Sequence, residues 1–297
     1  MPEELQRRFF LWGQPFEAPP LAPGLYVVAT PIGNLTDITL RALQTLAAAD
    51  LILCEDTRHS ARLLDHYGVK GRRKSLHEHN EREAVDWIAG LLAEGQVIAL
   101  ISDAGTPLLS DPGFPLVRAL RERDLPVFAV PGPSALLAAL ASAGLPTDRF
   151  SFIGFLPAKA GAREGAIAAL KGREDTLVFY ESPRRLDACL AALRDGFGPD
   201  RDAVVALELT KKFERVARGT LEALATQFAQ DDTKGEAVVL VAGAGAPAEP
   251  LEADWQDALA EAMAENSLRE AVDMVSARFD LPRKKVYDAA LKRKAEY

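Results

Sequence analysis

The sequence is poor in the residues that mark several protein classes. Its 297 residues include two cysteines, three methionines and four histidines. Cys54 and Cys189 are too few for a disulfide framework or a zinc cluster, and such sparse use is typical of a reducing cytoplasm. No apolar run reaches the length of a membrane span, and the N-terminus lacks the apolar segment of a signal peptide. We therefore expect a soluble cytoplasmic protein.

Positive charge is also in short supply. Lysine and arginine total 35 against 43 aspartates and glutamates, which gives a formal net charge of −8. The protein as a whole should repel nucleic acid, so any such partner must meet a local basic patch. The hydrophobic content of 48% is ordinary for a globular protein with a full core. The length predicts two domains and a small appendage.

Short apolar runs alternate with helical patterns along most of the chain. The predicted strands span 25–30, 51–54, 97–101, 127–130, 150–155, 176–180, 203–209 and 237–241. The predicted helices lie near 38–46, 80–94, 116–123, 162–170, 183–194, 221–228, 255–264, 267–279 and 283–292. Thr36 or Asp37 is expected to cap the first helix, and Ser134 to begin one after 127–130. Strands separated by helices predict α/β domains.

Composition divides the chain into four regions. Residues 1–23 form an extension, in which Phe9, Phe10 and Trp12 are expected to pack on the body. Two α/β domains follow, and three short helices with helix-turn-helix spacing end the chain. The predicted boundaries are 1–23, 24–133, 134–245 and 246–297, with a linker by composition at 244–250.

The stretch 97–113, VIALISDAGTPLLSDPG, organises the chain. A strand buried on both faces is followed by a polar loop rich in Gly and Pro. Ligands of open α/β sheets bind outside the carboxyl ends of strands. There Asp103 can accept hydrogen bonds from an amine or hydroxyl, and Gly105 permits close approach. The alternative is a tight turn in which Asp103 only caps neighbouring N–H groups.

Polar groups follow other predicted strands as well. The segment 55–59, EDTRH, is either a second wall of a site or a solvated loop with internal ion pairs. Ser134 within PGPSA is either only an N-cap or, together with the free N–H donors of that helix start, part of a site for a carboxylate or hydroxyl. His77 and His79 flank Glu78, but no second group has the spacing of metal ligands. We therefore expect no metal.

Nine segments in order are far more specific than any one of them. They read LYVVATPIGNLTDIT, CEDTRHS, HEHNE, ISDAGTPLLSDPG, VPGPSA, GLPTDRFSFIGFLP, FYESPRR, ELTKKFE and KGEAVVLV. Together they resemble the ribosomal RNA small subunit methyltransferase I family of the tetrapyrrole methylase (class III) superfamily. The resemblance covers about residues 24–245, and the tail resembles that family's small helical C-terminal domain. Residues 1–22 match nothing familiar.

The resemblance implies two α/β domains of tetrapyrrole-methylase type, with a cofactor cleft between them, plus a small C-terminal helical domain. It implies S-adenosyl-L-methionine as cofactor, a homodimer, and methyl transfer to the ribose 2′-hydroxyl of a cytidine, number 1402, in 16S rRNA of the small ribosomal subunit. The cofactor-binding residues that it implies are Ile32, Asp103, Gly105, Thr106, Ser134, Ala135, Tyr180, Gly235, Glu236 and Ala237.

Methyl transfer to a hydroxyl depends mainly on positioning, with help from a base. The candidate catalytic residues are Glu55, Asp56, Arg58, His59 and Lys211. The preferred hypothesis makes Glu55 or Asp56 the base, with Arg58 or Lys211 holding phosphate. It predicts that Glu55→Ala abolishes turnover while cofactor binding persists.

Cations are expected to flank the RNA path, although any one of them is more often a solvated surface residue. They are Arg58, Arg62, Arg72, Arg73, Lys74, Arg184, Arg185, Lys211 and Lys212, with Lys284 and Lys285 in the basic tail. Phe155, Tyr180 and Phe213 are candidates for stacking on bases. Two alternatives stay open: a methylase of the same fold acting on a tetrapyrrole or other small molecule, and a non-catalytic nucleic-acid-binding regulator.

Overall fold

The structure, a computed structural model, describes residues 7–77, 79–229, 235–245, 252–279 and 281–295. Contacts within the chain define two units, residues 1–244 and 245–297, and each is described by itself. Residues 1–6 of the predicted extension, Glu78, Lys234 and linker residues 246–250 lie outside the described part. None of the helices in the described ranges has the length and hydropathy needed to span a lipid bilayer.

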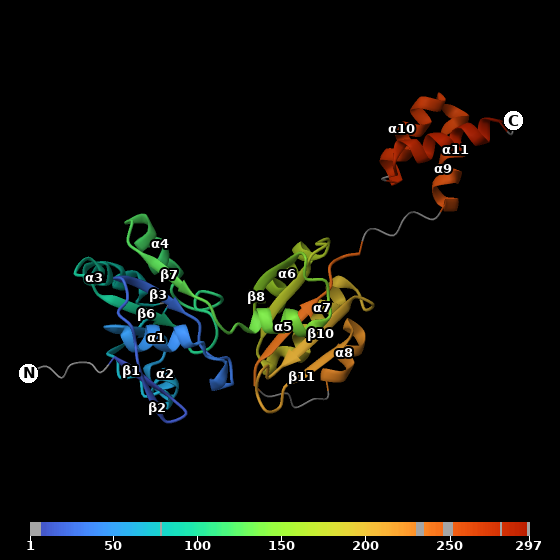
Figure 1. Cartoon of the computed structure of the whole chain (residues 1–297). Coiled ribbons are helices and arrows are strands. Elements are labelled where there is room, and N and C mark those ends of the chain that lie inside the picture. The colour runs from blue at the N-terminus through green and yellow to red at the C-terminus, as the bar shows by residue number, and fades with distance from the viewer. Residues whose placement is uncertain (1–6, 78, 230–234, 246–251, 280, 296–297) are drawn as a thin grey trace, which may run out of the picture. The chain divides into compact units, whose positions relative to one another are not determined.

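Five parallel strands form the first sheet, in the spatial order β5-β4-β6-β3-β7. They are β3 (Gly24–Val28), β4 (Leu51–Cys54), β5 (Arg73–Ser75), β6 (Val97–Ile101) and β7 (Val127–Val130). Strands β3, β6 and β7 of this sheet are labelled in Figure 1. The connecting helices are η1 (Leu35–Asp37), α1 (Leu40–Ala48), α2 (Thr57–His66), α3 (Glu81–Ala93) and α4 (Phe114–Glu122). Because the strands are parallel, their carboxyl ends share one edge of the sheet, where ligands bind in such folds.

The central strands of this sheet are buried on both faces because successive side chains point to opposite sides. In β4, Ile52 faces an apolar core shared with α1 and α2, whereas Leu53 faces a second core shared with α3 and α4. The uninterrupted apolar runs of β4 and β6 therefore have the pattern that the two-sided burial requires, and their predicted bounds are confirmed.

The second sheet is mixed, in the order β11-β10-β12-β9-β8. Its strands are β8 (Phe150–Phe155), β9 (Thr176–Glu181), β10 (Asp202–Leu207), β11 (Arg215–Thr220) and β12 (Ala237–Val241). β8 and β9 are parallel, and the other neighbouring pairs are antiparallel. Consequently the end of β9 at Glu181 lies beside the start of β12 at Ala237.

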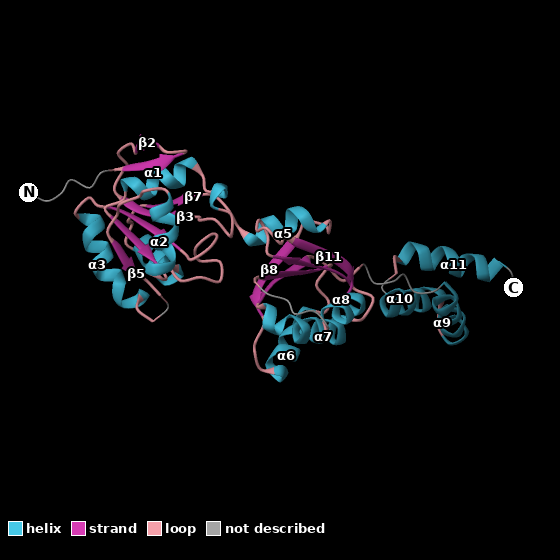
Figure 2. Cartoon of the chain, turned by 90° about the horizontal axis from the view of Figure 1, so that it is seen from below, coloured by secondary structure: helices cyan, strands magenta, loops and turns pink. Residues whose placement is uncertain are grey.

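Helices cover both faces of the second sheet (Figure 2). Three of them, α6 (Ala160–Leu170), α7 (Leu186–Phe197) and α8 (Leu221–Phe228), bury one core. The opposite core is covered by α5 (Ala135–Ala143), and a short η2 turn (Pro183–Arg185) precedes α7. Because α5 follows β7 directly, the chain leaves the first sheet and joins the second within a few residues of Ser134.

The smaller unit is built from α9 (Glu252–Glu265), α10 (Leu268–Phe279) and α11 (Arg283–Ala295). These helices enclose their own apolar core around Trp255, Leu259 and Val272. A capping box begins α10: the Glu270 backbone N–H donates to the Ser267 hydroxyl, and the Ser267 N–H donates to the Glu270 carboxylate.

Several sequence predictions are corrected. Residues 57–66, expected to begin as a loop, form α2 with Asp56 as its N-cap. Neither Thr36 nor Asp37 caps α1; Thr39 does, accepting from the Ala42 N–H. The strand expected to run to Leu209 ends at Leu207, because Glu208 takes a positive φ of 51°.

The N-terminal extension is a hairpin of β1 (Arg8–Leu11) and β2 (Gln14–Glu17). Phe9 is buried as expected, but Trp12 at the turn is 95% exposed and does not pack on the body. Trp12 is the first residue of the two-residue turn that joins the strands, so its side chain lies beyond their paired region and is exposed. The edge strands β5 and β11 were not predicted, because both are charged and lack an apolar run.

Candidate active site

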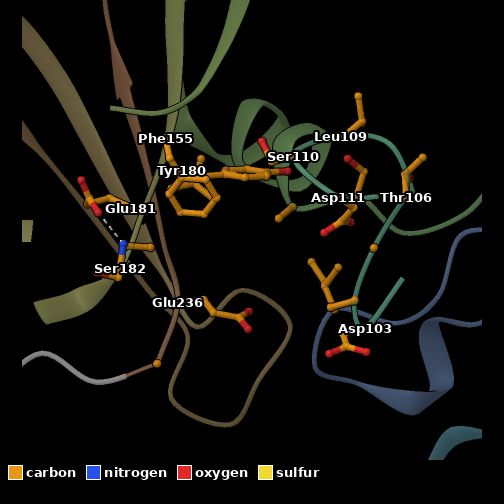
Figure 3. A pocket seen from close by; sticks show the side chains of 18 of the residues that line it. Asp103, Thr106, Leu109, Ser110, Asp111, Phe155, Tyr180, Glu181, Ser182 and Glu236 are labelled. Carbon is orange, nitrogen blue, oxygen red and sulfur yellow. Dashed lines mark hydrogen bonds between the residues drawn. The ribbon is translucent and has the colours of Figure 1, made fainter. Parts of the chain in front are cut away.

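A cavity of about 330 Å³ lies at the carboxyl edge of the first sheet within the larger unit. Residues of the second sheet complete it. All ten residues proposed to bind the cofactor line it: Ile32, Asp103, Gly105, Thr106, Ser134, Ala135, Tyr180, Gly235, Glu236 and Ala237. Figure 3 shows Asp103, Thr106 and Asp111 on one side, across from Tyr180 and Glu236 on the other. Residues from five separate segments of the sequence therefore converge on one space.

Hydrogen bonds join the loops that follow β3, β6 and β7. Thr30 and Gly105 exchange backbone hydrogen bonds of 2.8 and 3.0 Å. The Thr106 hydroxyl donates to the Pro133 carbonyl at 3.1 Å. Gly105 has a φ of +79°, and a Cβ there would lie 3.3 Å from Ile32. These contacts fix the first wall of the cavity and explain the glycine in it.

The loop 102–113 is strained and firmly anchored. Leu108 and Ser110 have φ angles of 75° and 66°, which residues with a Cβ rarely adopt. The loop ends where the Gly113 N–H donates to the buried Glu81 carboxylate at 2.8 Å. Backbone strain of this kind persists only where surrounding contacts enforce it, and it concentrates at functional sites.

Tyr180 and Ser134 connect the two walls. The Leu136 N–H, in the first turn of α5, donates to the Tyr180 hydroxyl at 3.1 Å. Burial raises the pKa of Tyr180, so the phenol stays protonated at neutral pH. Ser134 occupies the N-cap position of α5 without making the side-chain cap, and its buried hydroxyl oxygen has no partner among the described residues. A ligand in the cavity would supply one.

The second wall depends on a close contact between Gly235 and Glu208. Gly235 has a φ of +92°, and a Cβ there would lie 1.8 Å from the Glu208 carboxylate. That carboxylate accepts from the Glu236 N–H at 3.0 Å and from Lys211 Nζ at 2.9 Å. Burial opposes the charge of Lys211, but Glu208 and Glu236 together raise its pKa above the ordinary value. Lys211 is therefore a cation and not a base.

The cavity is acidic. Asp103, Asp111, Glu181 and Glu236 line it, and no lysine or arginine is among the described residues that do. Glu181 pairs with Arg185 and Glu236 with Lys211. Within the described ranges, no lysine or arginine forms an ion pair with Asp103 or Asp111. This charge distribution favours a ligand that carries positive charge.

The candidate catalytic segment 55–59 adjoins the cavity without lining it. The Asp56 backbone N–H donates to the Asp103 carboxylate at 3.2 Å, which ties the segment to the first wall. Asp56 caps α2 and pairs with Arg58, and the hydrogen bond from Arg58 lowers the pKa of the Asp56 carboxyl. Arg58 and His59 are exposed. The Asp56 carboxylate is therefore a weak base, and its oxygens are already engaged in capping α2 and pairing with Arg58.

The candidate RNA-binding cations differ in exposure. Those on the surface of the larger unit are Arg58, Arg62, Arg72, Lys74, Arg184 and Lys212, and Lys284 and Lys285 are exposed in the smaller unit. Arg73 pairs with Asp65. Arg185 points inward: it pairs with Glu181 at 3.2 Å and donates to the Leu156 carbonyl at 2.8 Å. Phe213, at 74% exposure, is open to solvent.

Comparison with known proteins adds independent findings. Residues 24–225 match the family of tetrapyrrole (corrin/porphyrin) methylases. The chain belongs to this family. Residues 249–294 match the C-terminal helix-turn-helix domain of RsmI proteins.

Two relatives named ribosomal RNA small subunit methyltransferase I illustrate the similarity within this family. The one from Mesorhizobium japonicum is 55% identical over 80% of this chain and 81% of its own length. The one from Pseudomonas aeruginosa is 46% identical over 92% of this chain and 98% of its own. The resemblance inferred from the nine segments is confirmed, and the chain is a methyltransferase of this group.

Solved structures confirm the fold. The methyltransferase CobJ matches with a TM-score of 0.57 at 21% identity, covering 74% of this chain and 94% of that one. Uroporphyrin-III C-methyltransferase from Thermus thermophilus, in complex with S-adenosylhomocysteine, matches with a TM-score of 0.52 at 22% identity over 74% of this chain and 97% of its own. The α/β fold class predicted from the sequence is thus that of tetrapyrrole methylases.

Sequence reasoning missed three participants in the site. Asp111 is not among the predicted site residues, although the Ser-Asp-Pro-Gly sequence after a buried strand marks its loop. Glu181 and Glu208, at the ends of two strands, are not among them either. The role of Glu208 comes from Gly235, which is distant in sequence, so no local pattern signals it. The Glu181–Arg185 pair is local, at i,i+4 spacing, but the sequence alone does not show that it is buried beside the cavity.

Proposed function

We propose that this methyltransferase uses S-adenosyl-L-methionine to methylate the ribose 2′-oxygen of cytidine 1402 in 16S rRNA of the small ribosomal subunit. The observation that carries the proposal is the single cavity lined by all ten residues that the resemblance implies for the cofactor. The names of the relatives support rRNA as the substrate.

The chemistry of the cavity fits the cofactor. S-adenosylmethionine carries an ammonium group and a sulfonium, and Asp103 is a carboxylate without a basic partner in the described part of the chain. The unpartnered hydroxyl of Ser134 and the backbone beside Gly105 are available to its polar groups. Ile32 and Tyr180 offer apolar surface for an adenine ring. When bound, the cofactor supplies a methyl group activated by a positively charged sulfur.

The residues of this chain have distinct roles in the proposal. Asp103, Gly105 and Thr106 bind the amino-acid end, with Ser134 and Ala135 beside it. Ile32, Tyr180 and the segment 235–237 hold the adenosine. Glu55, Asp56, Arg58, His59 and Lys211 form the rim that faces the ribose and its phosphates. Positioning of the ribose hydroxyl against the methyl group then supplies most of the rate enhancement.

The exposed cations are proposed to contact RNA through its phosphates. Arg58 and Arg62 lie one turn apart on α2, which begins beside the cavity at Asp56. Because the protein is acidic overall, RNA binding should depend on this local basic surface and should weaken steeply with added salt. Lys284 and Lys285 would add a second contact from the smaller unit.

We also propose a homodimer working in the cytoplasm. Edge strand β7 exposes Phe128, and Arg41 at the start of α1 donates to the Ala129 carbonyl of this strand. Exposed Leu40 adjoins Arg41, so an apolar surface extends along the sheet edge. Light scattering should give twice the mass of one chain, and a monomer at micromolar concentration would contradict the dimer.

The decisive experiment maps 2′-O-methylation on 16S rRNA from cells that lack and then regain the protein. Purified small subunits from the deficient cells should accept labelled methyl groups at cytidine 1402 alone. Asp103→Asn, which removes a carboxylate from the cavity, should not restore the mark. Transfer to a tetrapyrrole in place of the subunit would replace the proposal with the small-molecule alternative. Absence of any transfer would favour a non-catalytic regulator.

A further inference from the structure

The loop 102–113 holds Asp111 rigidly at the cavity. Ser110, which precedes Asp111, has a positive φ, and Gly113 is tied to the buried Glu81 carboxylate. A Cβ on Gly154 of β8 would lie 3.1 Å from the Ser110 hydroxyl, so the second sheet also packs closely on the loop. In Figure 3 the Asp111 side chain extends from this loop toward the space that Tyr180 faces. Its carboxylate therefore has a fixed place in the site.

Like charges surround Asp111. The charged groups that act on it are Glu55, after β4, and Asp103, after β6. From the second sheet, Tyr180 faces it as a protonated phenol. Ser102 is the neighbouring hydroxyl. Asp111 thus lies where two loops, those after β4 and β6, bring three carboxylates together at the edge of one sheet.

The other candidate bases are less suited to accept a proton. Asp56 caps a helix and pairs with Arg58. Lys211 is held as a cation by Glu208 and Glu236. Glu55 adjoins the cavity but is not among the residues that line it, whereas Asp111 is.

We propose that Asp111 is the general base of the methyl transfer, placed at the cavity with Glu55 and Asp103 as its charged neighbours. The inference rests on the proposed function. The ribose hydroxyl gives its proton to the Asp111 carboxylate as its oxygen forms the bond to the methyl carbon. The carbon–sulfur bond breaks, and its electron pair stays on sulfur, which becomes a neutral thioether. Asp111 then releases the proton to water.

The electrostatics agree with this role. Burial, with added repulsion from Glu55 and Asp103, raises the pKa of Asp111 to about 6. A carboxyl with this pKa is ionised at neutral pH, yet is a stronger base than an ordinary aspartate. The pKa of Asp56 shifts the other way: the hydrogen bond with Arg58 lowers it, so Asp56 is a weaker base than Asp111.

The test combines a titration with kinetics. In protein labelled with ¹³C at aspartate carboxyls, one signal should titrate near pH 6, and it should be absent in Asp111→Asn. Single-turnover methyl transfer to deficient small subunits should fall below the same pH in the wild type. Asp111→Asn should lower the rate by about 100- to 10,000-fold and lose this acid limb. Calorimetry should show that it still binds S-adenosylmethionine.

Two further variants separate a base from a merely structural residue. Glu55→Gln should move both the carboxyl titration and the acid limb toward the ordinary aspartate range, without abolishing transfer. Asp86→Asn, on the exposed surface of α3, is the matched control and should change neither. Unaltered cofactor binding by Asp111→Asn also verifies that it folds.

Each outcome decides the inference. Wild-type rates in Asp111→Asn would overturn the role of Asp111 while leaving the methyltransferase function intact. Abolished transfer in Glu55→Gln together with an active Asp111→Asn would make Glu55 the base, as the sequence hypothesis has it. If the wild type itself transfers no methyl group to the subunit, the proposed function fails and the base falls with it.

Discussion

The two walls of the cavity come from sheets with different topologies, and the difference explains how each wall works. In the parallel sheet, Asp103 and Ser134 both follow strands, because every carboxyl end reaches the same edge. In the mixed sheet, Tyr180 lies at the end of β9 while Ala237 lies at the start of β12. The first wall therefore gathers carboxylates on successive loops, whereas the second depends on one antiparallel pair and the contacts that hold it.

This comparison predicts that the second wall is the more fragile of the two. Its segment 235–237 depends on Gly235, where a Cβ would overlap the Glu208 carboxylate. Gly235→Ala should displace this segment and lower the affinity for S-adenosylmethionine about 100-fold or more, equivalent to roughly 3 kcal/mol. Isothermal titration calorimetry measures the effect.

Gly165→Ala is the control for that substitution. Gly165 lies in α6 with nothing within 4 Å of an added Cβ, so alanine there should leave cofactor affinity unchanged. It should raise stability by about 0.5–1 kcal/mol, because alanine favours helix. If Gly235→Ala bound the cofactor as tightly as Gly165→Ala does, cofactor binding would not require the close Gly235–Glu208 contact of the second wall.

The adjacent residues Arg184 and Arg185, which follow Glu181 of the second wall, should affect different properties, one RNA binding and the other stability. Glu181 is a buried residue of the second wall, and Arg185 is its ion-pair partner. Arg185→Ala should lower the free energy of unfolding by about 3 kcal/mol, because it leaves a buried charge uncompensated. Chemical denaturation measures this loss.

Arg184 provides the matched variant. It is exposed, so Arg184→Ala should leave stability within about 0.5 kcal/mol of the wild type. It should instead weaken binding to rRNA and reduce the slope of log affinity against log salt by about one. Equal losses of stability in the two variants would contradict the distinction drawn from their burial.

The first wall could be located from the sequence because its signals are local. Apolar runs such as Val97–Ile101 predict buried strands, and a polar loop that follows one predicts a site. The second wall was assigned only through resemblance to a family. Antiparallel pairing brings the start of one strand beside the end of another. Local sequence patterns do not predict which strands pair in this way.

Local sequence patterns could not predict the features that depend on tertiary contacts. The positive φ of Leu108 and Ser110 is imposed by the loop's anchors, since neither residue favours that conformation. Helix α2 was missed because Thr57, Arg58 and His59 have the composition of a polar loop, and only Asp56 as its cap starts the helix there. The raised pKa of Asp111 comes from its burial in the assembled site, with added repulsion from Glu55 on another loop and from Asp103 on the same loop.

The first wall should also carry a cost in stability that the second does not. The folded pKa of Asp111 is about 6 against an ordinary 3.8, so the folded protein binds more protons than the unfolded chain between these pH values. Stability should therefore fall as pH rises through this window. Since the side chain is partly exposed, the penalty at pH 7.5 should be about 1 kcal/mol, below the roughly 3 kcal/mol of the full shift.

Asp111→Asn should remove this penalty and raise the melting temperature at pH 7.5 by about 2–4 °C. The gain should shrink as the pH is lowered from 6 toward 4, because the wild-type carboxyl becomes neutral in the folded state. Thermal denaturation of both proteins across this range provides the measurement, with Asp86→Asn as the exposed control. If the variant loses stability at pH 7.5, or gains the same stability at every pH, the ionised Asp111 carboxylate does not destabilise the folded protein. Asp111 would then lack the raised pKa that burial, with repulsion from Glu55 and Asp103, gives it, and with it the basicity that the proposed role requires.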